Sequence, residues 1–81
     1  MDFIVGQIVK AKAGRDKDGF FVVVALDGAF ALIADGRRRK VEQPKRKKLI
    51  HLAPTKSVAQ VFATNREVKR ALSDFLQEND D

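Results

Sequence analysis

The side chains best suited to chemistry in this chain are the cations of residues 37–48, which read RRRKVEQPKRKK. Eight of these twelve residues are Lys or Arg, and Glu42 is the only acid among them. Arginine can contact one phosphate through two parallel N–H groups, and each phosphate that is neutralised releases bound counterions. Clustered like charges also repel one another and lower stability. The segment therefore indicates a polyanionic partner, or a stretch that stays in solvent.

The excess positive charge of the chain is confined to this segment. The 81 residues include 16 Lys and Arg against 11 Asp and Glu, a formal net charge of +5. Eight of the basic residues and one of the acidic residues lie in positions 37–48, so the rest of the chain holds 8 basic and 10 acidic residues, a net of −2. We therefore expect a local anion-binding surface rather than a generally basic protein.

Length and composition narrow the class of protein. A chain of 81 residues with 44% hydrophobic content is typical of one small folded domain. The sequence has no cysteine, which excludes disulfides, a zinc knuckle and thiol catalysis and indicates a reducing compartment. No apolar run is long enough to span a bilayer, and the N-terminus lacks the pattern of a signal peptide. We expect a soluble cytoplasmic protein with no membrane partner.

Asp-Gly pairs divide the first half of the chain into short β-prone runs. Such a pair favours a tight hairpin turn, because both central residues of a type I′ turn need positive φ. We predict strands over residues 7–13, 20–26, 29–34 and 37–42, and a fifth over residues 49–53 that Pro54 ends. The second run, FFVVVAL, is apolar on both faces, so this strand needs cover on each side.

The C-terminal segment can supply the second cover. Residues 57–60 and 64–67 both have the spacing of a capping box, and an apolar stripe of helical period follows, made of Val68, Leu72, Phe75 and Leu76. We predict one helix or two over residues 57–78, with residues 78–81 frayed. The predicted fold is mostly β with a C-terminal α segment: a five-stranded SH3-like barrel over residues 1–54, followed by a helical segment over residues 55–81 that packs on the barrel. An OB-type barrel is the nearest alternative.

Residues 6–26, GQIVKAKAGRDKDGFFVVVAL, resemble the KOW motif, a hairpin of two barrel strands around a glycine-containing loop found in ribosomal proteins and transcription elongation factors. The likeness continues through residues 32–54, LIADGRRRKVEQPKRKKLIHLAP. The chain is similar to small bacterial KOW proteins related to KOW-bearing ribosomal proteins of the large subunit. This resemblance implies that Gly14 supplies the loop turn and that Arg15 and Lys17 lie at its tip. One position departs from it, because Asp18 stands where glycine is expected.

The candidate RNA-binding residues are all basic: Lys10, Lys12, Arg15, Lys17, Arg37, Arg38, Arg39, Lys40, Lys45, Arg46, Lys47 and Lys48. We expect residues 37–42 to extend as a rigid basic hairpin strand, and residues 45–48 to follow as an extended basic stretch. Such a surface suits a folded RNA that is read by shape and phosphate position. The alternatives are a solvated surface or a localisation tag.

Base reading has little support in the composition. The chain has neither Tyr nor Trp, and we expect Phe20 and Phe21 to be core residues rather than platforms for base stacking. Without such platforms, little sequence specificity is expected.

Metal binding and catalysis have less support still. His51 is the single histidine, and no cysteine is present to complete a metal site with it. The Ser and Thr residues have no evident general base nearby in the sequence. We therefore expect a non-catalytic RNA-binding module without a cofactor, and the resemblance to KOW proteins implies an association with ribosomal RNA and translation. The alternative is a protein-interaction adaptor, in which the Phe-rich strand or the helix contacts ribosomal proteins or RNA polymerase.

Overall fold

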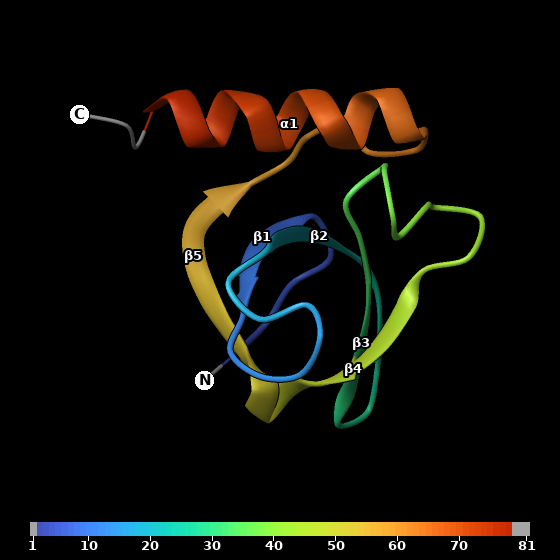
Figure 1. The fold of residues 1–81 in the computed structure, drawn as a ribbon, viewed down its shortest axis with the longest axis vertical. Helices are drawn as coiled ribbons and strands as arrows, with labels where there is room; N and C mark the ends of the chain where they lie inside the picture. The colour runs from blue at the N-terminus through green and yellow to red at the C-terminus, as the bar shows by residue number, and fades with distance from the viewer. Residues whose placement is uncertain (1, 79–81) are drawn as a thin grey trace.

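The computed structural model describes residues 2–78, which form a curved antiparallel sheet followed by one helix (Figure 1). The elements are β1 (Gln7–Ala11), β2 (Phe20–Asp27), β3 (Phe30–Ala34), β4 (Lys45–Lys48), the 3-10 turn η1 (Leu49–His51), β5 (Leu52–Val58) and α1 (Asn65–Glu78). The strand order is β4-β3-β2-β1-β5, with β4 and β5 at the two edges. The predicted class is confirmed: the chain is mostly β, consistent with a small SH3-like barrel whose sheet is not closed, followed by a C-terminal helix.

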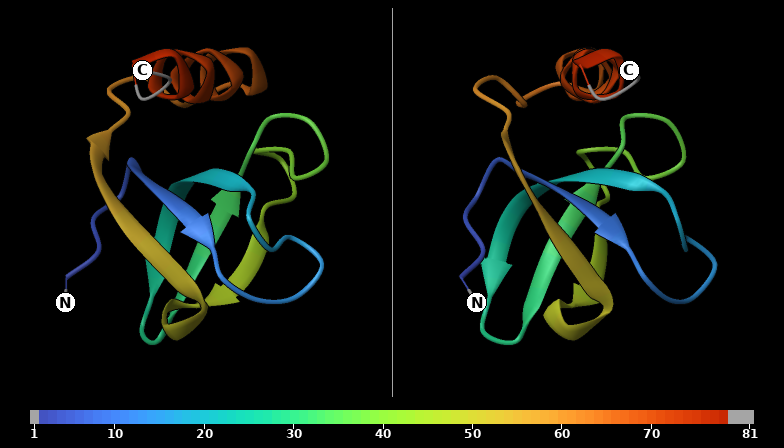
Figure 2. Two further views of the ribbon diagram at one scale, coloured as in Figure 1. Left: turned by 60° about the vertical axis from the view of Figure 1, so that its left-hand side comes forward. Right: turned by 90° about the vertical axis from the view of Figure 1, so that its left-hand side faces the viewer.

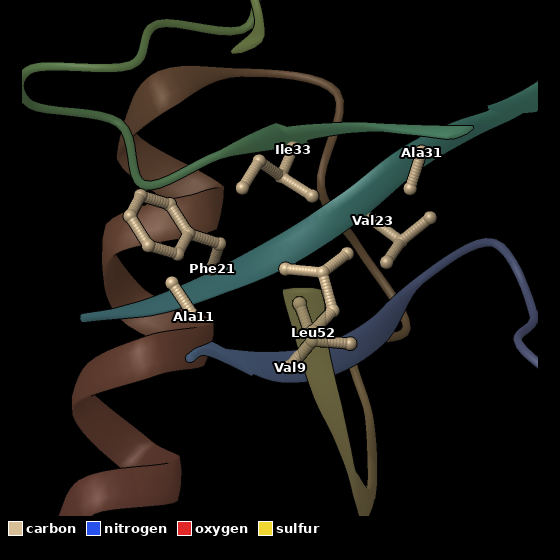
Figure 3. Close-up of a cluster of buried hydrophobic side chains, with 7 residues drawn as sticks. All are labelled: Val9, Ala11, Phe21, Val23, Ala31, Ile33 and Leu52. Atoms are coloured by element: carbon tan, nitrogen blue, oxygen red, sulfur yellow. The ribbon is translucent and has the colours of Figure 1, made fainter. Parts of the chain in front are cut away.

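Strand β2 is covered on both faces, as its composition predicts. Phe21 and Val23 point into the barrel, where they belong to a buried cluster with side chains from β1, β3 and β5 (Figure 3). Val22 points the other way and joins a second buried cluster beneath α1. The register agrees with this division, because Val9 pairs with Phe21 on the inner face and Ile8 pairs with Val22 on the outer face. Successive side chains of a strand alternate between faces, so one strand serves both cores.

Helix α1 closes the outer core and lies across one end of the barrel (Figures 1 and 2). Its buried residues are Val68, Leu72 and Phe75, which lie on one face of the helix. The predicted capping box at its start is confirmed. The backbone N–H of Glu67 donates to Oγ1 of Thr64 at 3.1 Å, and the N–H of Thr64 donates to Oε1 of Glu67 at 3.1 Å. These two bonds satisfy donors that the first helical turn leaves free.

The prediction of a strand over residues 37–42 is wrong. These residues form a loop, and the fourth strand is β4, over Lys45–Lys48. Residues 37–48 are therefore a structured loop followed by a short edge strand, and not a hairpin strand projecting into solvent.

The prediction that Pro54 ends the fifth strand is also wrong. Residues 49–51 form η1, and β5 runs from Leu52 to Val58 with Pro54 inside it. The strand tolerates the proline because β5 is an edge strand, where a missing N–H need not break a ladder. The predicted boundary at residues 54 and 55 consequently falls within β5.

Residues 55–78 contain a single helix, α1, and it begins at the later of the two predicted starts. Ser57 lies in β5, so residues 57–60 are not a helix cap, whereas residues 64–67 are. Of the predicted frayed end, residues 79–81 lie outside the described residues, and Glu78 is the last residue of α1. Within residues 2–78, no helix has both the length and the apolar character needed to cross a membrane.

Candidate nucleic-acid interface

Asp35 shapes the loop that carries the consecutive arginines. Its Oδ1 accepts hydrogen bonds from the backbone N–H groups of Arg37 and Arg39, each at 2.9 Å. The backbone N–H groups of Asp35 and Gly36 both donate to the carbonyl oxygen of Arg39, at 2.8 Å and 3.1 Å. Aspartate commonly stabilises a turn by bonding the backbone a few residues further on. These four bonds give residues 35–39 a fixed backbone conformation in place of the predicted strand.

A partly buried ion pair joins this loop to the loop between β1 and β2. Nε and Nη2 of Arg39 donate to Oδ1 and Oδ2 of Asp16, at 3.3 Å and 3.0 Å. The Asp16 side chain is 5% exposed and that of Arg39 is 27% exposed. Two parallel hydrogen bonds fix the relative orientation of guanidinium and carboxylate. Both loops project from the same side of the barrel (Figure 2), and this pair holds them together.

Helix α1 holds the arginine loop from the other side. Oδ1 of Asn65 accepts a hydrogen bond from the backbone N–H of Val41 at 2.8 Å, and its Nδ2 donates to Oε1 of Glu42 at 2.6 Å. Gly36 approaches the helix so closely that a Cβ at this position would lie 2.5 Å from the carbonyl oxygen of Asn65. Its φ of +79° is also one that residues with a side chain rarely adopt. The loop is thus fixed by its own aspartate, by the neighbouring loop and by the helix.

The exposed cations of the two loops form what we call the two-loop patch: Arg15, Lys17, Arg37, Arg38 and Lys40. Within residues 2–78, none of these five side chains forms an ion pair with an acid. Their charges therefore remain available to an anion in solvent. The patch unites two segments that are about twenty residues apart in the sequence.

Lys69 of α1 adds a cation that the sequence did not single out. It lines one groove with Arg37 and Phe20, together with the carboxylates of Asp18 and Asp35. In the sequence, Lys69 is an ordinary residue on the polar face of an amphipathic helix. Only the close approach of Gly36 to α1 brings it to the edge of the two-loop patch.

The four cations of β4 divide between two environments. Lys47 pairs with Ala31, which belongs to the inner core, and its side chain is directed under the β1–β2 loop. This lysine is only 8% exposed, and its Nζ donates to the carbonyl oxygen of Ala13 at 2.6 Å. Lys45 shares that face of the strand but is exposed. Lys47 therefore stabilises the loop between β1 and β2 through this hydrogen bond.

The other two cations of β4 lie on the outer face of the sheet. Arg46 pairs with Leu32 and Lys48 with Phe30. Cζ of Arg46 lies over the Phe30 ring, 3.6 Å from its centroid, and Nη2 lies 3.7 Å from Oδ2 of Asp27. Arg46 thus has two partners on the outer face, and Lys48 is exposed beside it.

Two further candidates, Lys10 in β1 and Lys12 just after it, are not part of the two-loop patch. Lys12 is exposed, while Nζ of Lys10 lies 3.9 Å from Oδ1 of Asp18 and 5.8 Å from the centroid of Phe20. Among the twelve candidates, Arg39 and Lys47 differ from the rest, because their charged ends donate hydrogen bonds to other parts of the fold. We assign these two residues to positioning the loops rather than to contact with a ligand.

Asp18 takes the backbone conformation for which glycine was expected. Its φ is +72°, in the left-handed region, and aspartate is one of the few residues with a side chain that tolerates it. Gly14, which was expected to supply the loop turn, has a φ of +81°. Residues 14 and 18 of this loop therefore both have the left-handed backbone conformation.

The expected roles of the paired phenylalanines are confirmed. Phe21 is buried in the inner core, and Phe20 packs against Phe75 of α1, with the ring centroids 5.1 Å apart.

His51 lies in η1 rather than in the predicted strand, and its carbonyl oxygen accepts a hydrogen bond from the N–H of Lys12. Among the described residues, no three side chains of the kinds that bind metals gather at one place.

A scan of protein-family models finds no match to this chain, and a search of curated proteins finds no significant match. The likeness to KOW proteins therefore rests on the sequence of residues 6–26 and 32–54.

Proposed function

We propose that this chain is a non-catalytic RNA-binding module that acts in the cytoplasm on ribosomal RNA, in the mature or the assembling ribosome. The observation that carries the proposal is the two-loop patch, in which five exposed cations without acidic partners in residues 2–78 are held on one side of the barrel. The resemblance of residues 6–26 and 32–54 to KOW proteins points to the same class of ligand.

The mode of binding follows from what holds the cations. The backbone of residues 35–39 is fixed by Asp35, and Asp16 fixes Arg39 against the neighbouring loop. Binding therefore orders little beyond the side chains of the patch, which keeps its entropic cost low. A fixed array of cations selects a surface with matching phosphate spacing, and such a surface is a property of folded RNA.

RNA suits this surface better than duplex DNA. A helix that reads the major groove needs an exposed face with a few side chains that reach the bases. Helix α1 instead packs its apolar face on the barrel, and its exposed residues include both Arg70 and Asp74. The cations that lack acidic partners lie on loops, which suits contact with backbone phosphates.

A titration of labelled, structured RNA followed by fluorescence anisotropy tests the proposal. If the five cations of the two-loop patch each neutralise one phosphate, a plot of log K against log salt concentration should have a slope near −4. A slope near zero contradicts phosphate binding as the mechanism.

An apolar groove favours a second candidate function, that of a protein-interaction adaptor contacting ribosomal proteins or RNA polymerase. The groove lies between the sheet and the segment that precedes α1, and its apolar lining includes Val24, Leu32, Val41, Pro44, Val61 and Phe62. Exposed apolar surface of this kind often marks a protein contact. Replacing Arg38, Lys40, Arg46 and Lys48 with alanine separates the two functions. An adaptor would keep its protein partner after this change, whereas an RNA-binding module would lose its RNA while remaining folded.

A further inference from the structure

Arg46 differs from the other exposed cations, because its guanidinium lies against an aromatic ring. Cζ is 3.6 Å from the centroid of Phe30, which is van der Waals contact between the guanidinium and the face of the ring. The contact follows from the sheet register. Phe30 pairs with Lys48, and Arg46, two residues earlier in β4, is its diagonal neighbour on the same face.

The Arg46 side chain is 55% exposed, so the side of its guanidinium that points away from Phe30 can be reached from solvent. Its Nη2 also lies 3.7 Å from Oδ2 of Asp27, at the edge where the N–H groups are. A phosphate approaching that edge would meet the Asp27 carboxylate. A flat, uncharged ring on the side away from Phe30 would meet no such repulsion.

We propose that Arg46 and Phe30 form a stacking platform for one unpaired nucleobase of the bound RNA. The base would lie on the solvent-accessible side of the Arg46 guanidinium, which Phe30 supports from the other side. Guanidinium planes and aromatic rings are the surfaces on which proteins stack splayed RNA bases, and every base has a π-face. The ligand class is thus an RNA in which a bulged or loop nucleotide adjoins a run of ordered phosphates.

The arrangement of the side chains makes this platform effective. Arginine side chains have considerable rotamer freedom, and a partner on one face together with a carboxylate at the edge restricts it before any ligand binds. Lys48 lies on the same face of β4 two residues after Arg46, and it is exposed. It is placed to contact a phosphate that flanks the stacked base. The proposal rests on the proposed RNA-binding function and adds to it a preference for RNA with an unpaired base.

Two matched RNAs test the platform. One is a hairpin with a single bulged adenosine, and the other is the same hairpin with an abasic nucleotide at the bulge, so the phosphates are equal and only the base differs. We expect the wild-type protein to bind the first RNA about five- to tenfold more tightly. The salt dependence of binding should be the same for both RNAs, because the phosphate contacts do not change.

Two variants of the platform and one control complete the test. Arg46→Lys keeps the charge and removes the plane, and Phe30→Leu keeps an apolar side chain and removes the ring. Both should reduce the preference to within about twofold, because neither retains the full stack. Arg70→Lys makes the same chemical change at an exposed arginine of α1, outside the two-loop patch, and should leave the preference unchanged. Phe30 is partly buried, so Phe30→Leu could fail to fold. In that case Arg46→Lys alone tests whether the preference for the bulged base depends on the platform.

The outcomes separate the platform from the proposed function. Salt-dependent binding without any preference for the bulged base in the wild type overturns the platform and leaves the phosphate-binding function standing. An undiminished preference in Arg46→Lys also overturns it. Absence of salt-dependent binding to either RNA overturns the proposed function as well.

Discussion

Asp16→Asn tests whether the ion pair between the loops positions the two-loop patch. The amide is almost the same size as the carboxylate and keeps one acceptor oxygen, but it removes the charge that pairs with Arg39. The Asp16 side chain is 5% exposed and that of Arg39 is 27% exposed, so solvent screens this pair only in part. Hydrogen bonds to charged groups contribute about 1.5–3 kcal/mol each, and breaking a buried pair outright costs about 3–5 kcal/mol. Because one acceptor remains, we expect the free energy of unfolding to fall by about 2 kcal/mol.

The direction in which Asp16→Asn changes RNA affinity shows whether Asp16 acts by positioning the loops or only through its charge. Removing a negative charge beside a cationic surface should strengthen RNA binding if the surface keeps its shape. We expect the opposite, a loss of about fivefold, because the loops must be ordered again on binding and this ordering costs about 1 kcal/mol. Anisotropy titrations with a structured RNA at fixed salt measure the affinity, and urea unfolding followed by circular dichroism measures the stability.

Asp18→Asn is the matched control, since it makes the same change two residues further along the same loop. The Asp18 side chain is 72% exposed and lies 3.9 Å from Nζ of Lys10, a surface contact of little energetic value. Asparagine also tolerates the positive φ of this position. This variant should keep wild-type stability to within about 0.5 kcal/mol and bind RNA at least as tightly as the wild type. If Asp16→Asn is as stable as Asp18→Asn, or binds RNA as tightly, the loops do not depend on the ion pair and the reasoning fails.

Two further predictions concern the contacts that hold the arginine loop and begin the helix. Gly36→Ala should reduce the free energy of unfolding by about 2 kcal/mol or more, because the new Cβ would lie 2.5 Å from the carbonyl oxygen of Asn65. Gly28 also has a positive φ, but a Cβ added there would have nothing within 4 Å, so Gly28→Ala should reduce the free energy of unfolding by less. Equal reductions in the two variants would contradict the role of the close approach to α1. Thr64→Ala should reduce the free energy of unfolding by about 1 kcal/mol, because it removes the oxygen that accepts the N–H of Glu67. Thr64→Ser keeps an acceptor oxygen and should keep the wild-type stability. Wild-type urea midpoints for Thr64→Ala would refute the cap.

The fold class could be predicted because its signals are local. Glycine and aspartate mark the turns of the first three strands, and the two-faced strand β2 requires both a barrel interior and a helix. The cap at Thr64 could be recognised for the same reason, since its partner Glu67 is three residues away. Ser57 shows the limit of such a motif, because its spacing is also that of a cap although it lies in β5.

The shape of the basic segment could not be predicted, because distant residues determine it. The prediction of a strand over residues 37–42 did not include two hydrogen bonds to distant residues. Arg39 donates to Asp16, 23 positions away, and the N–H of Val41 donates to Asn65, 24 positions away. The sequence also gives no sign of which lysines of β4 are buried. Lys47 alone donates to the carbonyl oxygen of Ala13, because the sheet register directs it under the β1–β2 loop. The charge of the site could be predicted, but its geometry depended on tertiary contacts.

The most direct test of the account compares two double variants that lose the same charge on different surfaces. Arg38→Ala with Lys40→Ala removes two cations of the two-loop patch. Lys56→Ala with Arg70→Ala removes two exposed cations near β5, which lies across the barrel from the arginine loop (Figure 1). Salt-dependent titration with one structured RNA gives the number of phosphates that each protein neutralises.

We predict that the first double variant has a log–log slope shallower than wild type by about 1.4 to 1.8, and that the second matches the wild type. Equal slopes for the two double variants would show that binding follows net charge and not the placement of the loops, and would contradict the account.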